Sequence, residues 1–503
     1  MHYPMCHMGH YENLVTRFLK IDKLNHAMTF LYWDQAVTMP PNGAKARQES
    51  LAELASIKHQ TLTDPALENE FKQAQSESLT AEQKTSLAEM NLQWSHAKCL
   101  PEDLVKQKVL AGATCEQGWR TQKKENDWPN FLKNFKEVVN LSRQEATLRM
   151  EHSGGAFSTP YEALMDLYCH GDSQADVDAV FDTIKNTIPT LFKKVIEKQK
   201  SEKTDKPKMI SIPTEVQKKI NLELMKSLRF DFESGRLDAS AHPFSTGDFG
   251  DQRITTRYQE TMLLDTLLAT AHETGHASYE AGLPESWHGL PVGKARNMCI
   301  HESQSLLFEK MIFTNQHFLD HFVPRAHAEH SALKQFSVDD IWHLLTRVQA
   351  SFIRVEADEV SYPLHVLMRY EIERDLVNKK LEASDVPDAW HEKSMHYLGL
   401  PTEGNFKEGC MQDIHWTDGS FGYFPSYTLG AINAAQLWAS LTSEHPGWEE
   451  KLTSGDVSFA KGWLSDKIWS KASTLSSSEL MRGASNENTN PQFLIDHLTQ
   501  RYL

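Results

Sequence analysis

The sequence has few cysteines and no long apolar run. Six cysteines are scattered over 503 residues and none forms a C-x-x-C pair, so neither a zinc ribbon nor a disulfide framework is expected. The first residues, MHYPMCHMGH, lack the apolar core of a secretory signal peptide. No window reaches the roughly 18 uninterrupted apolar residues of a transmembrane helix. These absences favour reduced thiols, a cytoplasmic location and no membrane partner.

The chain also has fewer basic than acidic residues. The chain has 52 Lys and Arg against 68 Asp and Glu, which gives a net charge of −16. Because this field repels phosphates, no nucleic-acid partner is expected. The 40% hydrophobic content is typical of a folded globular protein. Four potential metal ligands near the start are expected to lie in a frayed terminus: His2, Cys6, His7 and His10.

Most of the chain has the apolar spacing of amphipathic helices. Residues 13–37, 44–62, 78–100 and 176–203 repeat apolar residues every three or four positions, and the part from residue 425 onward returns to this pattern. Residues 234–258 differ, because short β-capable runs alternate there with Gly and Pro, which predicts a small sheet or hairpin. We therefore expect a mainly α protein with one small β element near its middle.

A helix is predicted over residues 259–283, and it contains the pattern H-E-x-x-H at 272–276. His272 and His276 are four residues apart, so they lie on one helix face and can share a metal ion. Glu273 is turned about 100° away, where it can reach a metal-bound water. This is the arrangement of zinc hydrolases. The alternative is a chance match in a chain with 24 histidines.

A third ligand has to come from another segment. A metzincin is excluded, because Tyr279 and Gly282 occupy the positions of its glycine and its third histidine. Glu302, at the start of a second predicted helix, is the favoured ligand, and two histidines with one glutamate leave a fourth position for water. His301 is the competing choice, and His288, in a loop, is a weaker one.

Several separate motifs together resemble the M32 metallocarboxypeptidases, the group that includes the thermostable carboxypeptidase from Thermus. The resemblance runs from about residue 10 to the C-terminus, and the motifs follow the order of that family. They are WDQAVTMPPNG at 33–43, HPF at 242–244, DQRIT at 251–255, HETGH at 272–276, HESQS at 301–305, IRVEAD at 353–358 and GCMQDIHW at 409–416.

The resemblance implies a helical metallopeptidase fold with a deep substrate groove, similar to that of neurolysin, with the small β element next to the metal helix. One peptidase domain over residues 1–503 is expected, or two helical lobes that flank the groove and divide near 200–210, where the charged segment SEKTDKPK predicts a solvated loop. Members are usually homodimers that remove C-terminal residues from peptides with broad specificity, using Zn²⁺ or Co²⁺. On this match His272, His276 and Glu302 bind the metal and Glu273 is the base.

Two rival functions remain at this stage. A neurolysin-like helical zinc endopeptidase or dipeptidase would share the metal chemistry and differ only at the closed end of the groove, but the order of motifs favours the carboxypeptidase. A catalytically inactive scaffold that binds peptides would normally have lost a ligand or the base, and here all four residues are intact.

The reaction needs further groups outside the metal set. Tyr423 is predicted to donate a hydrogen bond to the oxyanion of the intermediate, and Tyr427 to contact substrate. The alternative for both tyrosines is packing in the core. Arg354 is predicted to bind the terminal carboxylate of the peptide, and its alternative is a helical salt bridge with Asp358. Asp358 and Asp413 are candidates for orienting ligand or substrate groups.

Other motif residues carry weaker expectations. Asp251 and Arg253 lie in the β-like stretch, where they either meet a substrate added as a strand or form a structural ion pair. His242 and His415 either touch substrate or satisfy buried polar groups, with His415 placed in the groove lining. Pro363 is expected inside a long helix, which it would kink.

Overall fold

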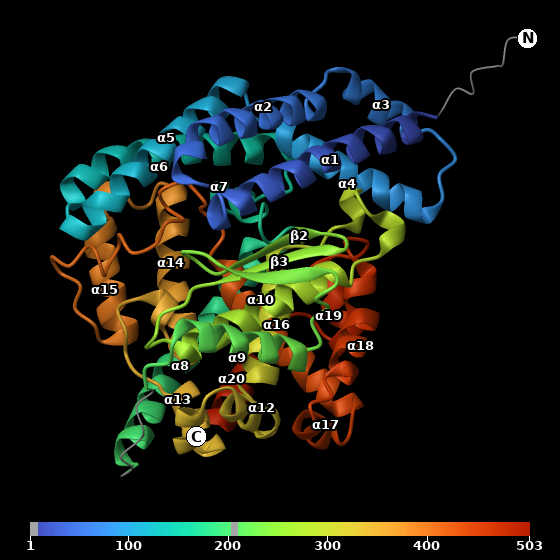
Figure 1. Cartoon of the computed structure of the whole chain (residues 1–503). Helices are drawn as coiled ribbons and strands as arrows, with labels where there is room; N and C mark the ends of the chain where they lie inside the picture. Colours follow the sequence, from blue (N-terminus) through green and yellow to red (C-terminus); the bar gives the residue numbers. More distant parts are fainter. Residues whose placement is uncertain (1–8, 203–209) are drawn as a thin grey trace, which may run out of the picture.

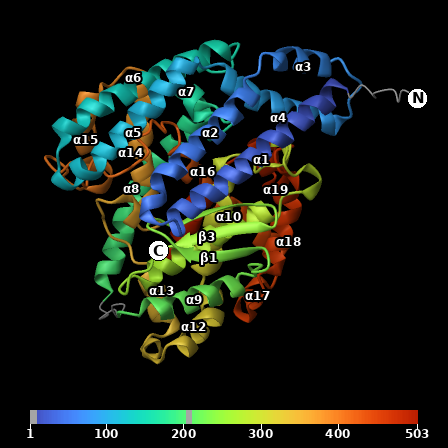
Figure 2. The ribbon, with the colours of Figure 1, turned by 45° about the horizontal axis from the view of Figure 1, so that its top comes forward.

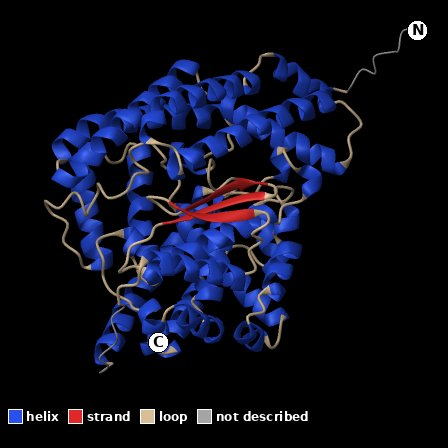
Figure 3. Cartoon of the chain, viewed as in Figure 1, coloured by secondary structure: helices blue, strands red, loops and turns tan. Residues whose placement is uncertain are grey.

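The computed structural model describes residues 9–202 and 210–503 (Figure 1). His2, Cys6 and His7, expected in a frayed terminus, therefore lie outside the described residues. The same expectation is wrong for His10, which begins α1 and contacts Glu70 at 2.9 Å. The protein is mainly helical with one small sheet, as predicted (Figure 3). The helices before the sheet are α1 (His10–Val37), α2 (Ala44–Leu62), α3 (Ala66–Ala74), α4 (Ala81–Lys98), α5 (Glu102–Glu125), α6 (Trp128–His152), α7 (Pro160–Met165), α8 (Gln174–Ser201) and α9 (Thr214–Ser227).

The helices after the sheet carry the remaining motifs. They are α10 (Leu263–Ala281), α11 (Met298–Leu306), α12 (Gln316–Glu329), α13 (Val338–Leu345), α14 (Tyr362–Val377), α15 (Val386–Leu398), α16 (Pro425–Glu444), α17 (Trp448–Ser454), α18 (Ser458–Lys467), α19 (Ser477–Ser485) and α20 (Gln492–Tyr502). Every helix among the described residues is too short or too polar to cross a lipid bilayer.

The β element predicted at 234–258 is a three-stranded sheet of β1 (Gly235–Ala239), β2 (Phe244–Asp248) and β3 (Asp251–Thr256). β3 lies between a parallel β1 and an antiparallel β2. The sheet lies between α1 and α10 (Figures 1 and 2). Asp251 and Arg253 therefore lie on the central strand, so the expectation that a peptide could add beside them at a sheet edge is wrong.

The hydrophobic core of the described residues is divided into a large cluster and a small one, besides a third of four buried side chains between the sheet, α9 and α10. The small one joins α1 to α4, with Phe18 and Phe71 among its buried side chains. The large one extends from Cys115 to Tyr502 and includes the buried face of α10. Part of the expected lobe boundary at 200–210 falls on residues 203–209, outside the described chain, and it stays a prediction. The clusters instead set the first four helices apart.

The segment before α14 is not the long helix that the sequence suggested. Residues 354–356 form a short 3₁₀ turn, and α14 begins only at Tyr362. Pro363 therefore occupies the first turn of α14, where a proline needs no hydrogen-bond donor and causes no kink. The predicted kink is wrong, and Arg354 lies on an irregular segment that is free to turn inward.

Candidate metal centre

Two packed helices bring three potential metal ligands together. α10 carries His272 and His276, and α11 carries Glu302. The Oε2 atom of Glu302 lies 3.5 Å from Nε2 of His272 and 3.9 Å from Nε2 of His276. One ligand atom from each residue lies within 4.8 Å of the others. These separations suit an ion held about 2.0–2.2 Å from each atom, and two imidazoles with one carboxylate are donors that Zn²⁺ accepts.

Two glycines allow the helices to approach closely enough. A Cβ atom on Gly275, inside the H-E-x-x-H pattern, would lie 2.6 Å from the backbone of Gln304 and Ser305 on α11. A Cβ atom on Gly430 of α16 would lie 2.5 Å from Cβ of Glu302. α11 is therefore held between α10 and α16 at the level of Glu302, which fixes where its carboxylate points.

The outer ring nitrogens of both histidines have partners. Nδ1 of His272 lies 2.8 Å from Oε2 of Glu309, and Nδ1 of His276 lies 2.5 Å from Nδ1 of His301. Nε2 of His301 contacts Glu280 at 2.8 Å. These contacts fix the ring orientations and turn the Nε2 atoms toward Glu302. His301, the competing ligand, thus has both ring nitrogens engaged and lies behind His276.

Glu309 is a residue that the sequence analysis missed. α11 continues into a π-helical turn over Leu307–Phe313, and such turns are frequent at functional sites. Burial alone would raise the pKa of Glu309, but Lys310, at 2.6 Å, and His272 lower it to about 2. Glu309 is therefore ionised at neutral pH and can accept a hydrogen bond from Nδ1–H of His272. Its spacing of seven residues from Glu302, two helical turns, was the signal that could have found it.

The candidate base is buried beside the ligands. Glu273 is 8% exposed. Burial raises its pKa to about 7, His272 opposes the shift, and the Glu302 carboxylate adds to it. A general base works best with a pKa near the working pH. The position and pKa of Glu273 both suit proton transfer.

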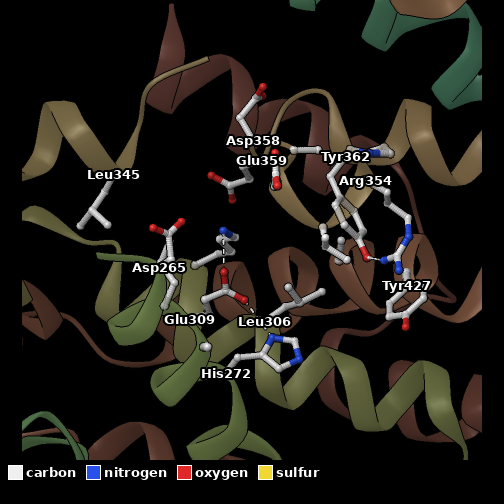
Figure 4. Close-up of a pocket in the computed structure, with 18 of the residues that line it drawn as sticks. Asp265, His272, Leu306, Glu309, Leu345, Arg354, Asp358, Glu359, Tyr362 and Tyr427 are labelled. Atoms are coloured by element: carbon white, nitrogen blue, oxygen red, sulfur yellow. Dashed lines mark hydrogen bonds and ion pairs between the residues drawn. The ribbon is translucent and has the colours of Figure 1, made fainter. Parts of the chain in front are cut away.

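A cavity of about 530 Å³ opens beside the metal ligands, and its lining includes His272, Glu273 and Glu302. Arg354, Tyr362 and Tyr427 stand together on another part of its wall (Figure 4). A second cavity of about 480 Å³ reaches His301, the neighbour of His276. His272 and Glu302 line the first cavity, whereas the second reaches His301 and none of the three ligand candidates.

Arg354 is 6% exposed and is held by two contacts. Its Nε donates to Asp413 at 3.0 Å and its Nη1 donates to the Tyr362 hydroxyl at 2.7 Å. Asp413 also accepts from Nε of Arg369 at 2.6 Å. The expected alternative, a salt bridge from Arg354 to Asp358, is wrong, because Asp358 accepts hydrogen bonds from nearby backbone amides instead.

The aromatic candidates form one cluster before and at the start of α16. The Tyr423 ring lies 5.0 Å from that of Tyr168 and 5.3 Å from that of Tyr427. The Tyr427 hydroxyl lies 3.4 Å from Nε2 of His415. Burial raises the pKa of Tyr423, and among nearby charges the Glu302 carboxylate raises it most.

Three weaker candidates lie elsewhere. His242 is exposed. Arg253 pairs with Asp251 at 2.5 Å and stacks over the Trp33 ring at 4.5 Å. The residues that line the two cavities do not include His242, Asp251 or Arg253. The ion-pair alternative for Asp251 and Arg253 is thus what the structure contains, and their substrate contacts stay a prediction. His288, the weakest ligand candidate, contacts Asp248 at 2.9 Å.

Comparisons with known proteins extend over nearly the whole chain. A family model described as Carboxypeptidase Taq (M32) metallopeptidase matches residues 13–502. Carboxypeptidase 1 of Bacillus subtilis (strain 168) is 32% identical over 491 residues, which cover 96% of each chain. Thermostable carboxypeptidase 1 of Thermus thermophilus is 32% identical over 504 residues, 98% of each chain. The solved structure of Trypanosoma cruzi metallocarboxypeptidase 1 has a TM-score of 0.95 and 38% identity, covering 98% of this chain and 99% of that one.

Proposed function

The chain belongs to the carboxypeptidase Taq (M32) family and is a metal-dependent carboxypeptidase, and we propose that His272, His276 and Glu302 hold its catalytic metal. The observation that carries this proposal is the convergence of two Nε2 atoms and one carboxylate within 4.8 Å. We propose Zn²⁺ as the ion, with Co²⁺ accepting the same donors. When bound, the ion would lower the pKa of a water molecule and polarise the scissile carbonyl.

Glu273 is the proposed proton carrier. Its carboxylate accepts the proton of the attacking water and then delivers it to the leaving amine. A pKa raised to about 7 by burial supports both halves of this task. Tyr423 is the proposed donor to the oxyanion, supported by the effect of Glu302 on its hydroxyl.

Arg354 is the proposed anchor of the peptide's terminal carboxylate. Asp413 and Tyr362 hold Nε and Nη1, while no hydrogen bond to the described residues engages Nη2. That group can donate to a carboxylate in the cavity. The Tyr427 ring lies 5.0 Å from the guanidinium and forms the adjacent wall, and His415 supports the Tyr427 hydroxyl. An anchor of this kind makes the enzyme cleave from the carboxyl end.

The rest of the peptide needs space on the other side of the scissile bond. We propose that the second cavity takes it, because that cavity reaches His301 beside the metal ligand His276. The family resemblance also leads us to propose a homodimer located in the cytoplasm. Light scattering of the purified chain tests the dimer.

Digestion of one peptide in two forms tests the proposed function. The metal-loaded protein is incubated with the free peptide and with its C-terminally amidated version, each with and without a chelator, and the products are identified by mass spectrometry. We expect stepwise loss of residues from the free carboxyl end, blocked by amidation and by the chelator. Internal cuts that amidation does not affect would favour the neurolysin-like endopeptidase instead.

A further inference from the structure

A second group of metal-ligating side chains lies between α1 and the sheet. Asp248 lies at the end of β2 and contacts two histidines. Its Oδ2 atom lies 2.7 Å from Nδ1 of His26, and its Oδ1 atom lies 2.9 Å from Nε2 of His288. Asp22, Asp248 and His288 each offer one ligand atom within 4.8 Å of the others. Three segments far apart in sequence therefore meet in one cluster of two imidazoles and two carboxylates.

The local structure is built to allow this meeting. Asp22 and His26 are four residues apart on α1 and share one face. Gly289 has a φ of 82°, and a Cβ atom there would lie 2.8 Å from Leu19 and 3.1 Å from Oδ2 of Asp22. Only a glycine permits this approach. Oδ1 of Asp22 pairs with Lys294 at 2.7 Å, so Oδ2 is the oxygen turned toward the loop.

We propose that Asp22, His26, Asp248 and His288 bind a second Zn²⁺, distinct from the catalytic one. Two imidazole nitrogens and two carboxylate oxygens are donors that Zn²⁺ accepts, and together they reach the four ligands of a structural zinc site. The three groups that already lie within 4.8 Å of one another need only side-chain rotation to surround an ion, and His26, joined to Asp248, is the fourth. This assignment is independent of the catalytic ligands.

The position of this site gives the ion a structural task. It would join α1 to the β2–β3 hairpin and to the loop that follows α10. Asp22 and Gly289 also line the second cavity, so the ion would fix one wall of that cavity. The small core cluster of α1 to α4 is separate from the main core. A metal clip would therefore hold the N-terminal helices against the catalytic part of the chain.

Calorimetric titration with Zn²⁺ tests this proposal on the full chain after metal removal. We expect two equivalents for the unaltered protein and one for the His26→Ala/His288→Ala double variant. The matched control is His343→Ala, an exposed histidine on α13, which should keep both. Binding of a single equivalent by the unaltered chain, or no loss in the double variant, would overturn the proposal.

The Glu302→Ala variant separates the two sites. It should lose the catalytic equivalent and keep the other, and Zn²⁺ should still raise its melting temperature until His26 and His288 are also replaced. If Glu302→Ala keeps both equivalents while the double histidine variant loses one, the catalytic assignment fails and the second site stands. In crystals soaked with Zn²⁺, an anomalous peak is expected between His26 and His288. A peak only at the catalytic site would overturn the inference.

Discussion

Nδ1 of His272 lies 2.8 Å from Oε2 of Glu309, seven residues beyond Glu302 on the same continuous helical segment. One stretch of chain thus supplies both a proposed metal ligand and the carboxylate that orients another proposed ligand. The π-helical turn Leu307–Phe313 brings this carboxylate to Nδ1 of the His272 ring. The metal affinity of the centre should therefore depend on a residue that does not touch the ion.

Glu309→Gln should weaken metal binding about 10- to 100-fold, because an amide orients His272 without supplying a negative charge. The dissociation constant for Zn²⁺ can be measured by competition with a chelator. Glu356→Gln is the matched control, since Glu356 lines the same cavity but is exposed. Equal affinities for Glu309→Gln and the unaltered chain would contradict this role.

Gly430→Ala should displace α11 and disturb Glu302. The added Cβ would lie 2.5 Å from Cβ of Glu302, and overpacking of this kind costs about 1–3 kcal/mol. We expect a lower melting temperature and a lower metal content. Gly462→Ala in α18 is the control, because nothing lies within 4 Å of its Cβ position and alanine favours a helix by about 0.5–1 kcal/mol. If Gly430→Ala and Gly462→Ala change the melting temperature and the metal content equally, close packing at Gly430 does not hold Glu302 in position.

Arg354→Lys should reduce discrimination between free and amidated peptides. Lysine keeps the charge but loses the fork that binds a carboxylate with two hydrogen bonds. We expect kcat/KM for a free peptide to fall at least about tenfold, with little change for the amidated form. Arg347→Lys, at an exposed arginine of the same cavity, is the control. The ratio of kcat/KM for the free peptide to kcat/KM for the amidated peptide measures the discrimination. If Arg347→Lys reduces this ratio and Arg354→Lys does not, the anchor is Arg347.

Stability should fall in weak acid partly because of His365. Burial, followed by Arg369 and Arg354, lowers its pKa to about 3, whereas an unfolded histidine titrates near 6.5. Between these values the unfolded chain binds more protons, so the free energy of unfolding rises with pH. This contribution is full above about pH 6.5 and is lost as the pH falls toward 3.

His365→Phe should remove this contribution. Urea unfolding between pH 6.5 and 4 should give a slope that is smaller by up to about 1.4 kcal/mol per pH unit than that of the unaltered chain. Identical slopes would show that His365 is not held neutral in the folded protein.

The parts of the centre that depend on local pattern could be predicted from the sequence. His272, Glu273 and His276 follow from spacing on one helix, and Glu302 from the start of a second. The helical ranges and the small sheet also follow from periodicity and from the distribution of Gly and Pro. These features are set within a few turns of the chain.

The parts that depend on packing between distant segments could not be predicted. Arg354 pairs with Asp413, 59 residues away, and no local pattern indicates this choice. The position of β3 in the centre of the sheet depends on a parallel pairing with β1. The sequence around Pro363 fits a proline inside a helix as well as a proline in its first turn. The 3₁₀ turn at 354–356, which keeps α14 from starting before Tyr362, distinguishes the two.

Metal content and peptide turnover of Glu273→Gln, measured on the same sample, test the central claim most directly. The account predicts a full catalytic equivalent of metal, since no ligand is changed, together with loss of turnover on a free peptide. Retained turnover would remove Glu273 from proton transfer. Loss of the metal would show that Glu273 supports the ion rather than the water, and would contradict the ligand set of His272, His276 and Glu302.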